Sequence, residues 1–326
     1  MKSFFKKLLS KPGKAEAPVA VEAGKPVEKY IQQYSKEPYN FQTITLDELL
    51  KRGDTIYDLY TNKNDGYLIK NFLTEAEVDA IMSNFPKAEN DSPAHTAVGF
   101  TYPPVFAEFS NRIRQEDEAQ KQRSIINYFE KTSLFNSEFK KNFGVDVKAR
   151  FENFFKAISG NRDIVVAEGM GGKGHYPFST FRYLTPDKGL MSVHCGNYFG
   201  KTFEDFYKDL TKKVAVENQM SFFIMLQEPE AGGELSLFNF RWKNGQTKSN
   251  PSEDNEIIQP DGSKMYVEED PAIIKDKIAP KKGDMILFQG GNIWHRVETV
   301  RGNIPRITFG GFIGISIDQQ KFYYWS

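Results

Sequence analysis

The segment Met191-Ser-Val-His-Cys-Gly-Asn197 is the most informative stretch of the chain, because it reads as a strand that carries a histidine. Side chains two residues apart on a strand point to the same face, so His194 and position 196 are expected to share a face. A histidine, a carboxylate two residues later and a distant second histidine form the facial triad of non-haem Fe(II) sites. Gly196 stands where the carboxylate is expected. The spacing therefore predicts an iron site with one coordination position that no side chain fills, which a ligand such as a halide can occupy.

A second histidine and an arginine follow in the order that such a site needs. His295 comes after Lys282-Gly-Asp-Met-Ile-Leu-Phe288 and a glycine-glycine turn. Arg306 and Thr308 share one face of the next expected strand. A planar guanidinium binds a carboxylate through two hydrogen bonds, and a threonine hydroxyl can add a third. We therefore predict His194 and His295 as metal ligands. Arg306 with Thr308 is predicted to bind 2-oxoglutarate.

Each of these residues has a more ordinary explanation when it is considered alone. A single histidine on a half-buried strand is usually structural, and a single arginine usually forms a surface ion pair. The ordered set favours the site, although a motif can occur by chance. Cys195 is expected to point to the opposite face, as a small buried apolar residue. His95 and His175 lack the spacing, and no nucleophile motif supports serine or cysteine catalysis.

The chain divides into a helical first part and a β-rich second part. Thr45-Leu-Asp-Glu48 and Thr74-Glu-Ala-Glu77 match the capping box that begins a helix. Apolar spacing predicts a further helix over 148–159, and a charged, glutamine-rich stretch predicts a more exposed one over 112–131. Strands are predicted over 163–167, 178–184, 190–196, 219–227, 234–240, 284–288, 293–300 and 305–316. This pattern predicts a mainly β fold with flanking α-helices, a cupin-like jelly roll.

The expected domain organisation follows from the composition along the chain. The N-terminal stretch lacks the apolar side chains that offset the entropy of ordering, so we expect a disordered basic tail and linker. A polar stretch between the later strands is expected to be an insertion, either a lid or a mobile loop. The expected boundaries are 1–40 for the tail and linker, 41–326 for a single domain, 41–160 for its helical part, 161–326 for its jelly-roll core and 241–283 for the polar insertion.

Composition also narrows the possible partners and the compartment. The 43 Lys and Arg residues balance 43 Asp and Glu residues, so no overall charge favours nucleic acid. No apolar run approaches the ~20 residues that span a bilayer, so no integral membrane segment is expected. The apolar side chains of Phe4, Phe5, Leu8 and Leu9 can form an amphipathic anchor, but a frayed tail explains them better. Cys195 is the only cysteine, which excludes a disulfide within the chain and fits a reducing, cytoplasmic location.

Several longer stretches are specific enough to indicate a family. They are Val193-His-Cys-Gly-Asn197, Pro229-Glu-Ala-Gly-Gly-Glu-Leu235, Lys282-Gly-Asp-Met-Ile-Leu-Phe288, His295-Arg-Val297, Gly302-Asn-Ile-Pro-Arg306, Gly310-Gly-Phe312 and Tyr323-Tyr-Trp-Ser326. In these stretches the chain resembles the freestanding Fe(II)/2-oxoglutarate-dependent halogenases of cyanobacterial indole-alkaloid biosynthesis, the welwitindolinone and ambiguine type, within the Fe(II)/2-oxoglutarate dioxygenase superfamily. The similarity runs from about residue 65 to the end, whereas 1–40 and much of 241–283 depart from it.

The resemblance implies a double-stranded β-helix fold and an iron-dependent reaction. Fe(II) would be held by His194 and His295, and 2-oxoglutarate would bind the iron and Arg306. Chloride would occupy the space that Gly196 leaves, with O2 as the oxidant. Ser221 falls where the family has a serine near the metal, although ordinary hydrogen bonding within a strand explains it equally well. The implied reaction belongs to secondary metabolism: it removes hydrogen from an aliphatic carbon of a small molecule and transfers chlorine to that carbon.

Two other functions remain open at this point. A hydroxylase or other oxidase would hold water, instead of chloride, at the open coordination position. A non-catalytic jelly-roll protein would use the same cavity only for binding, since a fold alone does not fix a function. The departures within 241–283 leave the substrate open, so an indole alkaloid is not carried over from the family. The sequence says nothing about oligomeric state.

Overall fold

The computed structural model describes residues 33–35, 39–85, 98–169, 172–202 and 207–326. The tail predicted over 1–40, with its apolar cluster at Phe4 and Phe5, lies almost entirely outside these residues, and so does His95. None of the helices in the described ranges is both long enough and apolar enough to cross a membrane.

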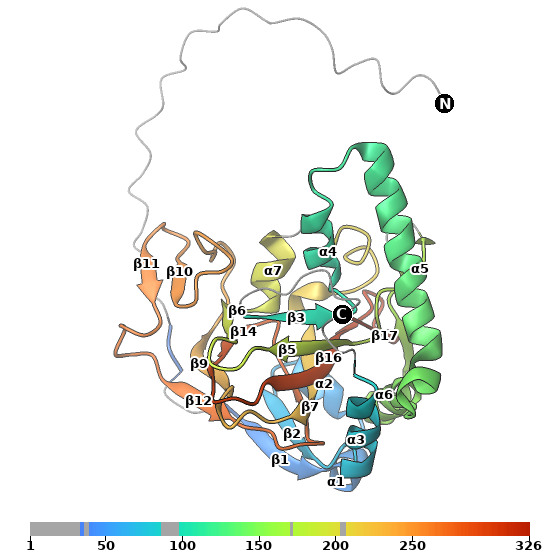
Figure 1. The fold of residues 1–326 in the computed structure, drawn as a ribbon. Helices are drawn as coiled ribbons and strands as arrows, with labels where there is room; N and C mark the ends of the chain where they lie inside the picture. The colour runs from blue at the N-terminus through green and yellow to red at the C-terminus, as the bar shows by residue number, and fades with distance from the viewer. Residues whose placement is uncertain (1–32, 36–38, 86–97, 170–171, 203–206) are drawn as a thin grey trace, which may run out of the picture.

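Two mainly antiparallel β-sheets form the centre of the molecule (Figure 1). The larger sheet has the order β1 (Phe41–Thr45), β2 (Gly66–Lys70), β13 (Met285–Phe288), β7 (Met220–Gln227), β16 (Arg306–Ile315), β17 (Lys321–Trp325) and β4 (Asp163–Val166), with β5 (Thr180–Leu184) beside β16 and β3 (Gly99–Tyr102) beside β5. The smaller sheet has the order β12 (Lys275–Ile278), β9 (Leu235–Arg241), β14 (Ile293–Val297) and β6 (Met191–His194). Two short pairs join β10 (Glu256–Ile258) to β11 (Lys264–Tyr266) and β8 (Ala231–Gly232) to β15 (Val300–Arg301). This is the double-stranded β-helix, or jelly roll, that the sequence predicts.

The two sheets pack against each other through apolar side chains. Leu235 and Leu237 of β9 and Ile293 of β14 lie in one buried cluster. Ile286 and Phe288 of β13 belong to the same cluster. Because β9 and β14 are in the smaller sheet and β13 is in the larger one, these side chains form the core between the layers. Side chains alternate along each strand, so the other face of each sheet packs against different elements.

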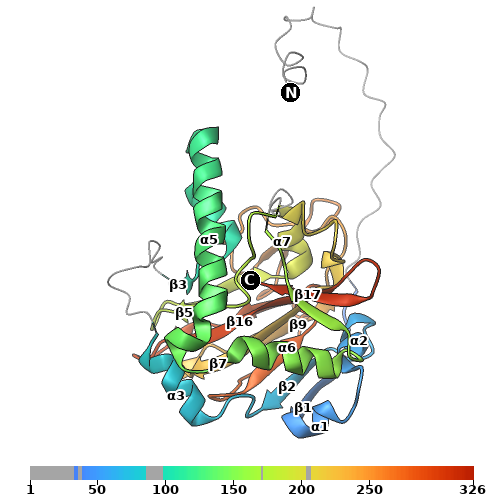
Figure 2. The ribbon, with the colours of Figure 1, turned by 90° about the vertical axis from the view of Figure 1, so that its right-hand side faces the viewer.

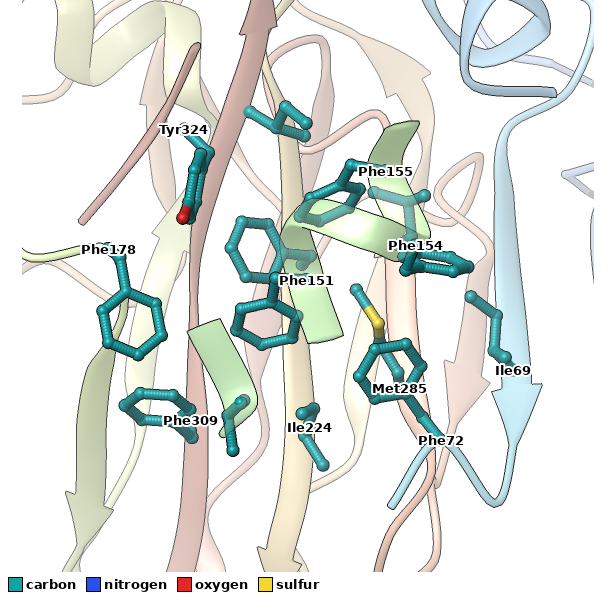
Figure 3. Close-up of a cluster of buried hydrophobic side chains, with 14 of the residues drawn as sticks. Ile69, Phe72, Phe151, Phe154, Phe155, Phe178, Ile224, Met285, Phe309 and Tyr324 are labelled. Carbon is teal, nitrogen blue, oxygen red and sulfur yellow. The ribbon is translucent and has the colours of Figure 1, made fainter. Parts of the chain in front are cut away.

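Helices cover the outer face of the larger sheet, and Figure 2 shows α6 lying across its strands. Phe151 and Phe155 of α6 meet the ring of Phe222 on β7 at centroid distances of 5.0 and 5.1 Å. Both side chains point toward the strands that carry Ile224 and Phe309 (Figure 3). The helices are α1 (Leu46–Leu50), α2 (Thr55–Tyr60), α3 (Glu75–Ser83), α4 (Phe106–Arg112), α5 (Glu118–Phe143), α6 (Val147–Ile158) and α7 (Gly196–Thr202).

Three of the helix predictions are confirmed. The hydroxyl of Thr45 accepts a hydrogen bond from the backbone N–H of Glu48 at 3.3 Å, which begins α1. The hydroxyl of Thr74 does the same for Glu77 at the start of α3, also at 3.3 Å. In both cases the glutamate accepts a hydrogen bond from the backbone of the threonine, so the capping boxes are complete. The helix predicted over 148–159 is α6.

The helix predicted over 112–131 is wrong at both ends. α5 begins only after Asp117, whose carboxylate caps the first turn. It continues to Phe143 and ends where Gly144 adopts the left-handed conformation, with φ of 76°. The predicted range is exposed only in part, because Tyr128 and Phe129 are buried, and beyond it Phe139 is buried in the core.

The strand predicted over 190–196 is too long. β6 ends at His194, and Gly196 is the first residue of α7. The backbone N–H of Gly196 donates to the carbonyl of Gly290 at 2.8 Å, so the chain leaves the sheet to meet the turn before β14. The strand predicted over 293–300 is likewise divided between β14 and β15.

The polar stretch 241–283 packs against the smaller sheet. It supplies β12, which pairs with β9, and the β10–β11 hairpin. Ile257 of this stretch lies in a buried cluster with Trp294 of β14. The Nζ atom of Lys248 donates to the carbonyl of Val193 at 2.7 Å. The stretch therefore supports the strand that carries His194.

Removing the ring of Phe151 tests the contact between α6 and the larger sheet. We expect Phe151→Ala to lower the free energy of unfolding by about 3–5 kcal/mol, because a fully buried aromatic side chain leaves a cavity. Leu134→Ala on α5 is the control, since this side chain is 56 % exposed. Urea unfolding of both variants checks the prediction, and an equal decrease in the free energy of unfolding for the two variants would contradict it.

Candidate metal centre

Two histidines face each other across a pair of neighbouring strands. His194 is the last residue of β6, and its Cα pairs with that of His295 in the antiparallel β14. Their ring centroids lie 4.2 Å apart, and both side chains are buried. The Nδ1 atoms lie 2.6 Å from the carbonyl oxygen of Ser192 and 2.7 Å from that of Ile293. Because a carbonyl oxygen can only accept, each Nδ1 donates, and each Nε2 keeps a free lone pair.

The surroundings hold both imidazoles in the neutral form. Burial lowers the pKa of His295 to about 4. Burial and the neighbouring His295 bring the pKa of His194 well below its usual value. A neutral imidazole with a free Nε2 is the form that binds a transition metal. Over the described parts of the chain, no group of three His, Cys, Asp or Glu side chains could hold a metal. The donors present therefore fit a metal with two protein nitrogens and further positions for other ligands.

Gly196 is buried at the start of α7, two residues after His194. A Cβ atom added to it would lie 2.1 Å from Nε2 of Gln219 and 3.0 Å from the Cα of Gly291. A side chain fits at this position only if Gln219 moves. The argument that His194 and Gly196 share one face of a strand is wrong, since the strand ends at His194. Cys195 is buried among apolar side chains, as expected, and burial raises the pKa of its thiol.

Arg306 is a buried cation at the start of β16. Its Nε and Nη2 atoms have no hydrogen-bond partner among the residues that the structure describes, and its guanidinium lies 5.2 Å from the ring centre of Phe223. Burial, together with the charge of Arg182, lowers the pKa of Arg306 to about 9, so the side chain is still charged at neutral pH. A buried, unpaired guanidinium is costly unless an anion binds it. Thr308 lies two residues further along the same strand and is also buried.

A cavity of about 570 Å³ opens beside the histidines. His194, His295, Ser221 and Thr308 line it, so the structure brings these four predicted residues to one space. Most of the remaining lining is apolar or aromatic. None of the described residues that line the cavity comes from 241–283, so the lid interpretation of that stretch has no support here. A cavity of this volume suits a small organic molecule.

One wall of the cavity comes from the N-terminal part of the chain. The segment from β3 to α4 contributes Phe100 and Phe106, together with the carboxylate of Glu108. Arg182 of β5 also lines the cavity, and its Nη1 atom lies 3.2 Å from the sulfur of Met191. The sequence reasoning missed Glu108 and Arg182. The only available signal for Arg182 was a charged side chain at an inward position of an otherwise apolar strand.

A jelly roll with two neutral histidines on one cavity, and a buried arginine on the strand whose Thr308 lines that cavity, is typical of the class of Fe(II)/2-oxoglutarate-dependent enzymes, although Arg306 and Gly196 are not themselves among the lining residues. The family model described as carrier-protein-independent halogenase WelO5 matches residues 38–326. The chain therefore belongs to this family, as its motifs predict, and it is an enzyme that uses Fe(II), 2-oxoglutarate and O2. Membership of a catalytic family removes the support for a non-catalytic binding protein.

Solved structures similar to this chain share little sequence with it. An N-substituted L-amino acid dioxygenase from Burkholderia ambifaria AMMD has a TM-score of 0.48 and 15% identity, over 82% of this chain and 90% of that chain. A prolyl-4-hydroxylase from Pseudomonas putida has a TM-score of 0.40 and 13% identity, over 82% and 97%. The epimerase SnoN from nogalamycin biosynthesis has a TM-score of 0.42 and 9% identity, over 82% of each chain. None of the curated proteins compared matches the chain in sequence.

Removing one imidazole tests the metal site. We expect His295→Ala to retain almost no Fe(II) after anaerobic loading and desalting, because a single remaining protein nitrogen cannot hold the ion. His175→Ala is the control, since His175 lies outside the residues that line the cavity. The bound iron per chain is measured by a colorimetric chelator assay. Iron content equal to that of the unmodified protein would remove His295 from the metal site.

Removing the buried guanidinium tests the co-substrate site. We expect Arg306→Ala to weaken 2-oxoglutarate binding by about 1.5–3 kcal/mol, the value of a hydrogen bond to a charged group, while iron binding changes much less. The measurement is an anaerobic titration of the metal-to-ligand charge-transfer band with 2-oxoglutarate. Arg301→Ala on β15 is the control, because Arg301 is exposed. An unchanged midpoint for Arg306→Ala would show that another residue binds the carboxylate.

Proposed function

We propose that this enzyme is a halogenase that transfers chlorine to an aliphatic carbon of a small molecule. The observation that supports it best is the glycine at 196, which offers no carboxylate next to the His194 and His295 pair. When bound, Fe(II) with 2-oxoglutarate and O2 supplies the one-electron oxidation that removes hydrogen from carbon. The family match over residues 38–326 agrees with the proposal.

In this proposal the protein's own residues hold and orient the reactants. The carbonyls of Ser192 and Ile293 fix the two imidazoles so that each Nε2 atom can bind the metal. Arg306 binds the far carboxylate of 2-oxoglutarate, with Thr308 as an additional donor. Ser221 lines the cavity and can donate a hydrogen bond to an oxygen that reacts there. The apolar walls keep water away from the reacting carbon.

Charge balance supports a halide at the open position. The two imidazoles are neutral, so among the described residues that line the cavity the charged groups are the guanidiniums of Arg112 and Arg182 and the carboxylate of Glu108. A carboxylate from the protein would supply one negative charge to the metal. With a glycine at 196, that charge must come from a bound anion, and chloride is the proposed one.

The lining of the cavity and the composition of the chain also indicate the kind of substrate and the compartment of the reaction. Its aromatic walls favour a mainly apolar molecule, which agrees with a role in secondary metabolism. We place the reaction in the cytoplasm, because the single, buried Cys195 fits a reducing compartment. The balanced charge of the chain gives no reason to expect nucleic acid as a partner.

Hydroxylation is the second candidate reaction. The open position beside Gly196 accepts water as well as chloride, and water leaves hydroxyl as the group available for transfer. The two reactions need the same histidines and the same arginine. Only the ligand at the open position separates them.

Replacing the glycine tests which ligand the open position holds. We expect Gly196→Asp to keep Fe(II) and 2-oxoglutarate but to lose chlorination, because the carboxylate takes the volume and the charge of the halide. Gly196→Ala is the control for bulk without a ligand. Each protein is incubated aerobically with chloride and a panel of apolar natural products, and mass spectrometry follows the chlorine isotope pattern. If the unmodified enzyme gives only hydroxylated products at saturating chloride, the halogenase proposal fails and hydroxylation stands.

A further inference from the structure

The side-chain amide of Gln219 overlaps the position that the Cβ atom of any other residue at 196 would take. Gln219 follows the 3₁₀ turn over Val216–Asn218 and precedes β7, and it is only 2 % exposed. A Cβ atom built on Gly196 would lie 2.1 Å from its Nε2 and 3.0 Å from its Cδ. In a His-x-Asp site the carboxyl carbon is bonded to this same Cβ atom. The amide therefore borders the start of the space that an aspartate side chain at 196 would fill, with its Nε2 atom nearest to that space.

Backbone contacts hold Gln219 in this place. Its carbonyl accepts a hydrogen bond from the N–H of Gly291 at 2.9 Å, and its own N–H donates to the carbonyl of Val216 at 3.1 Å. The N–H of Asn197 donates to the carbonyl of Gly291 at 3.0 Å, so the same turn holds both Gln219 and the start of α7. A Cβ atom on Gly291 would lie 2.5 Å from the Gln219 carbonyl oxygen, so this close approach requires glycine.

The amide has hydrogen-bonding capacity that the described residues do not use. Its Oε1 atom is buried without a partner. Its Nε2 atom is the heavy atom nearest to the Cβ position of residue 196. An amide oxygen can only accept, so the unpaired Oε1 atom indicates a donor such as water, whereas the Nε2 atom that faces Gly196 is the group able to donate to an anion. Ser221, two residues further along the chain, lines the cavity.

We propose that Gln219 is a specificity-determining residue for the halide: its amide N–H donates to the anion at the coordination position beside Gly196. This inference rests on the proposed halogenase function. A halide can only accept hydrogen bonds, so an N–H donor favours it. A carboxylate in the same place would repel it. Gly196 thus leaves the position free, and Gln219 selects what fills it.

Two nearly isosteric substitutions test the donor. Gln219→Met keeps the length without a donor, and Gln219→Glu replaces the donor by a carboxylate. Each protein is loaded anaerobically with Fe(II) and 2-oxoglutarate in chloride-free buffer, and sodium chloride is added while the charge-transfer band is followed. We expect both variants to bind Fe(II) and 2-oxoglutarate and to raise the Kd for chloride at least tenfold, with Gln219→Glu the weaker binder. Gln42→Glu on β1 is the control for the added charge.

The outcomes separate this inference from the proposed function. If chloride does not change the band of the unmodified protein, the proposed halide site fails. If chloride binds the unmodified protein and both variants equally well, only the role of Gln219 is overturned.

A second comparison depends on packing alone. Because the Gln219 amide fills the space of a side chain at 196, Gly196→Asp should melt at a lower temperature than Gly196→Asp combined with Gln219→Ala. Thermal unfolding of the two proteins without metal measures this difference. A double variant that is no more stable than Gly196→Asp alone would show that the amide does not occupy that space, and would overturn the inference even if the Gln219→Met and Gln219→Glu proteins do not fold.

Discussion

The antiparallel pairing of β6 with β14 is the contact on which the site depends. It sets the Cα atoms of His194 and His295 opposite each other, and hydrogen bonds to backbone carbonyls then orient both rings. The support behind this pair comes from 241–283, since Lys248 holds the Val193 carbonyl and apolar residues of the stretch pack on Trp294. Burial lowers the pKa of Lys248 to about 8, so this contact contributes a cation that is easily neutralised.

The electrostatics of the cavity follow from the same burial. Both imidazoles are neutral there, the cations Arg112 and Arg182 outnumber the carboxylate of Glu108, and Arg306 adds a buried positive charge next to Thr308 on β16. A cavity with this balance has a deficit of negative charge, and it favours anions over neutral ligands. In the proposed function, 2-oxoglutarate and a halide make up the deficit. In this proposal the bound anions supply the negative charge that a carboxylate side chain supplies in a His-x-Asp site.

Local sequence patterns predicted the jelly roll and the ordered set His194, His295 and Arg306, because alternation and turn signals lie within a few residues of one another. They could not predict where β6 ends. That boundary depends on hydrogen bonds to a turn nearly a hundred residues away in the chain. The same limit applies to Gln219, whose importance comes only from its distance to Gly196. The ends of α5 could have been predicted from the sequence, since Asp117 and Gly144 are ordinary capping residues. The charged and glutamine-rich composition of the stretch drew the prediction to other boundaries.

The cavity is assembled from two separate parts of the chain. The groups proposed to hold the metal and the co-substrate belong to the jelly roll, whereas much of one apolar wall comes from β3 and α4 in the N-terminal part. Substitutions between Gly99 and Arg112 can reshape that wall and leave the strands with the histidines unchanged. Descendants of one ancestor can therefore diverge in the molecules they accept while inheriting the same chemistry, and selection can act on the two parts independently.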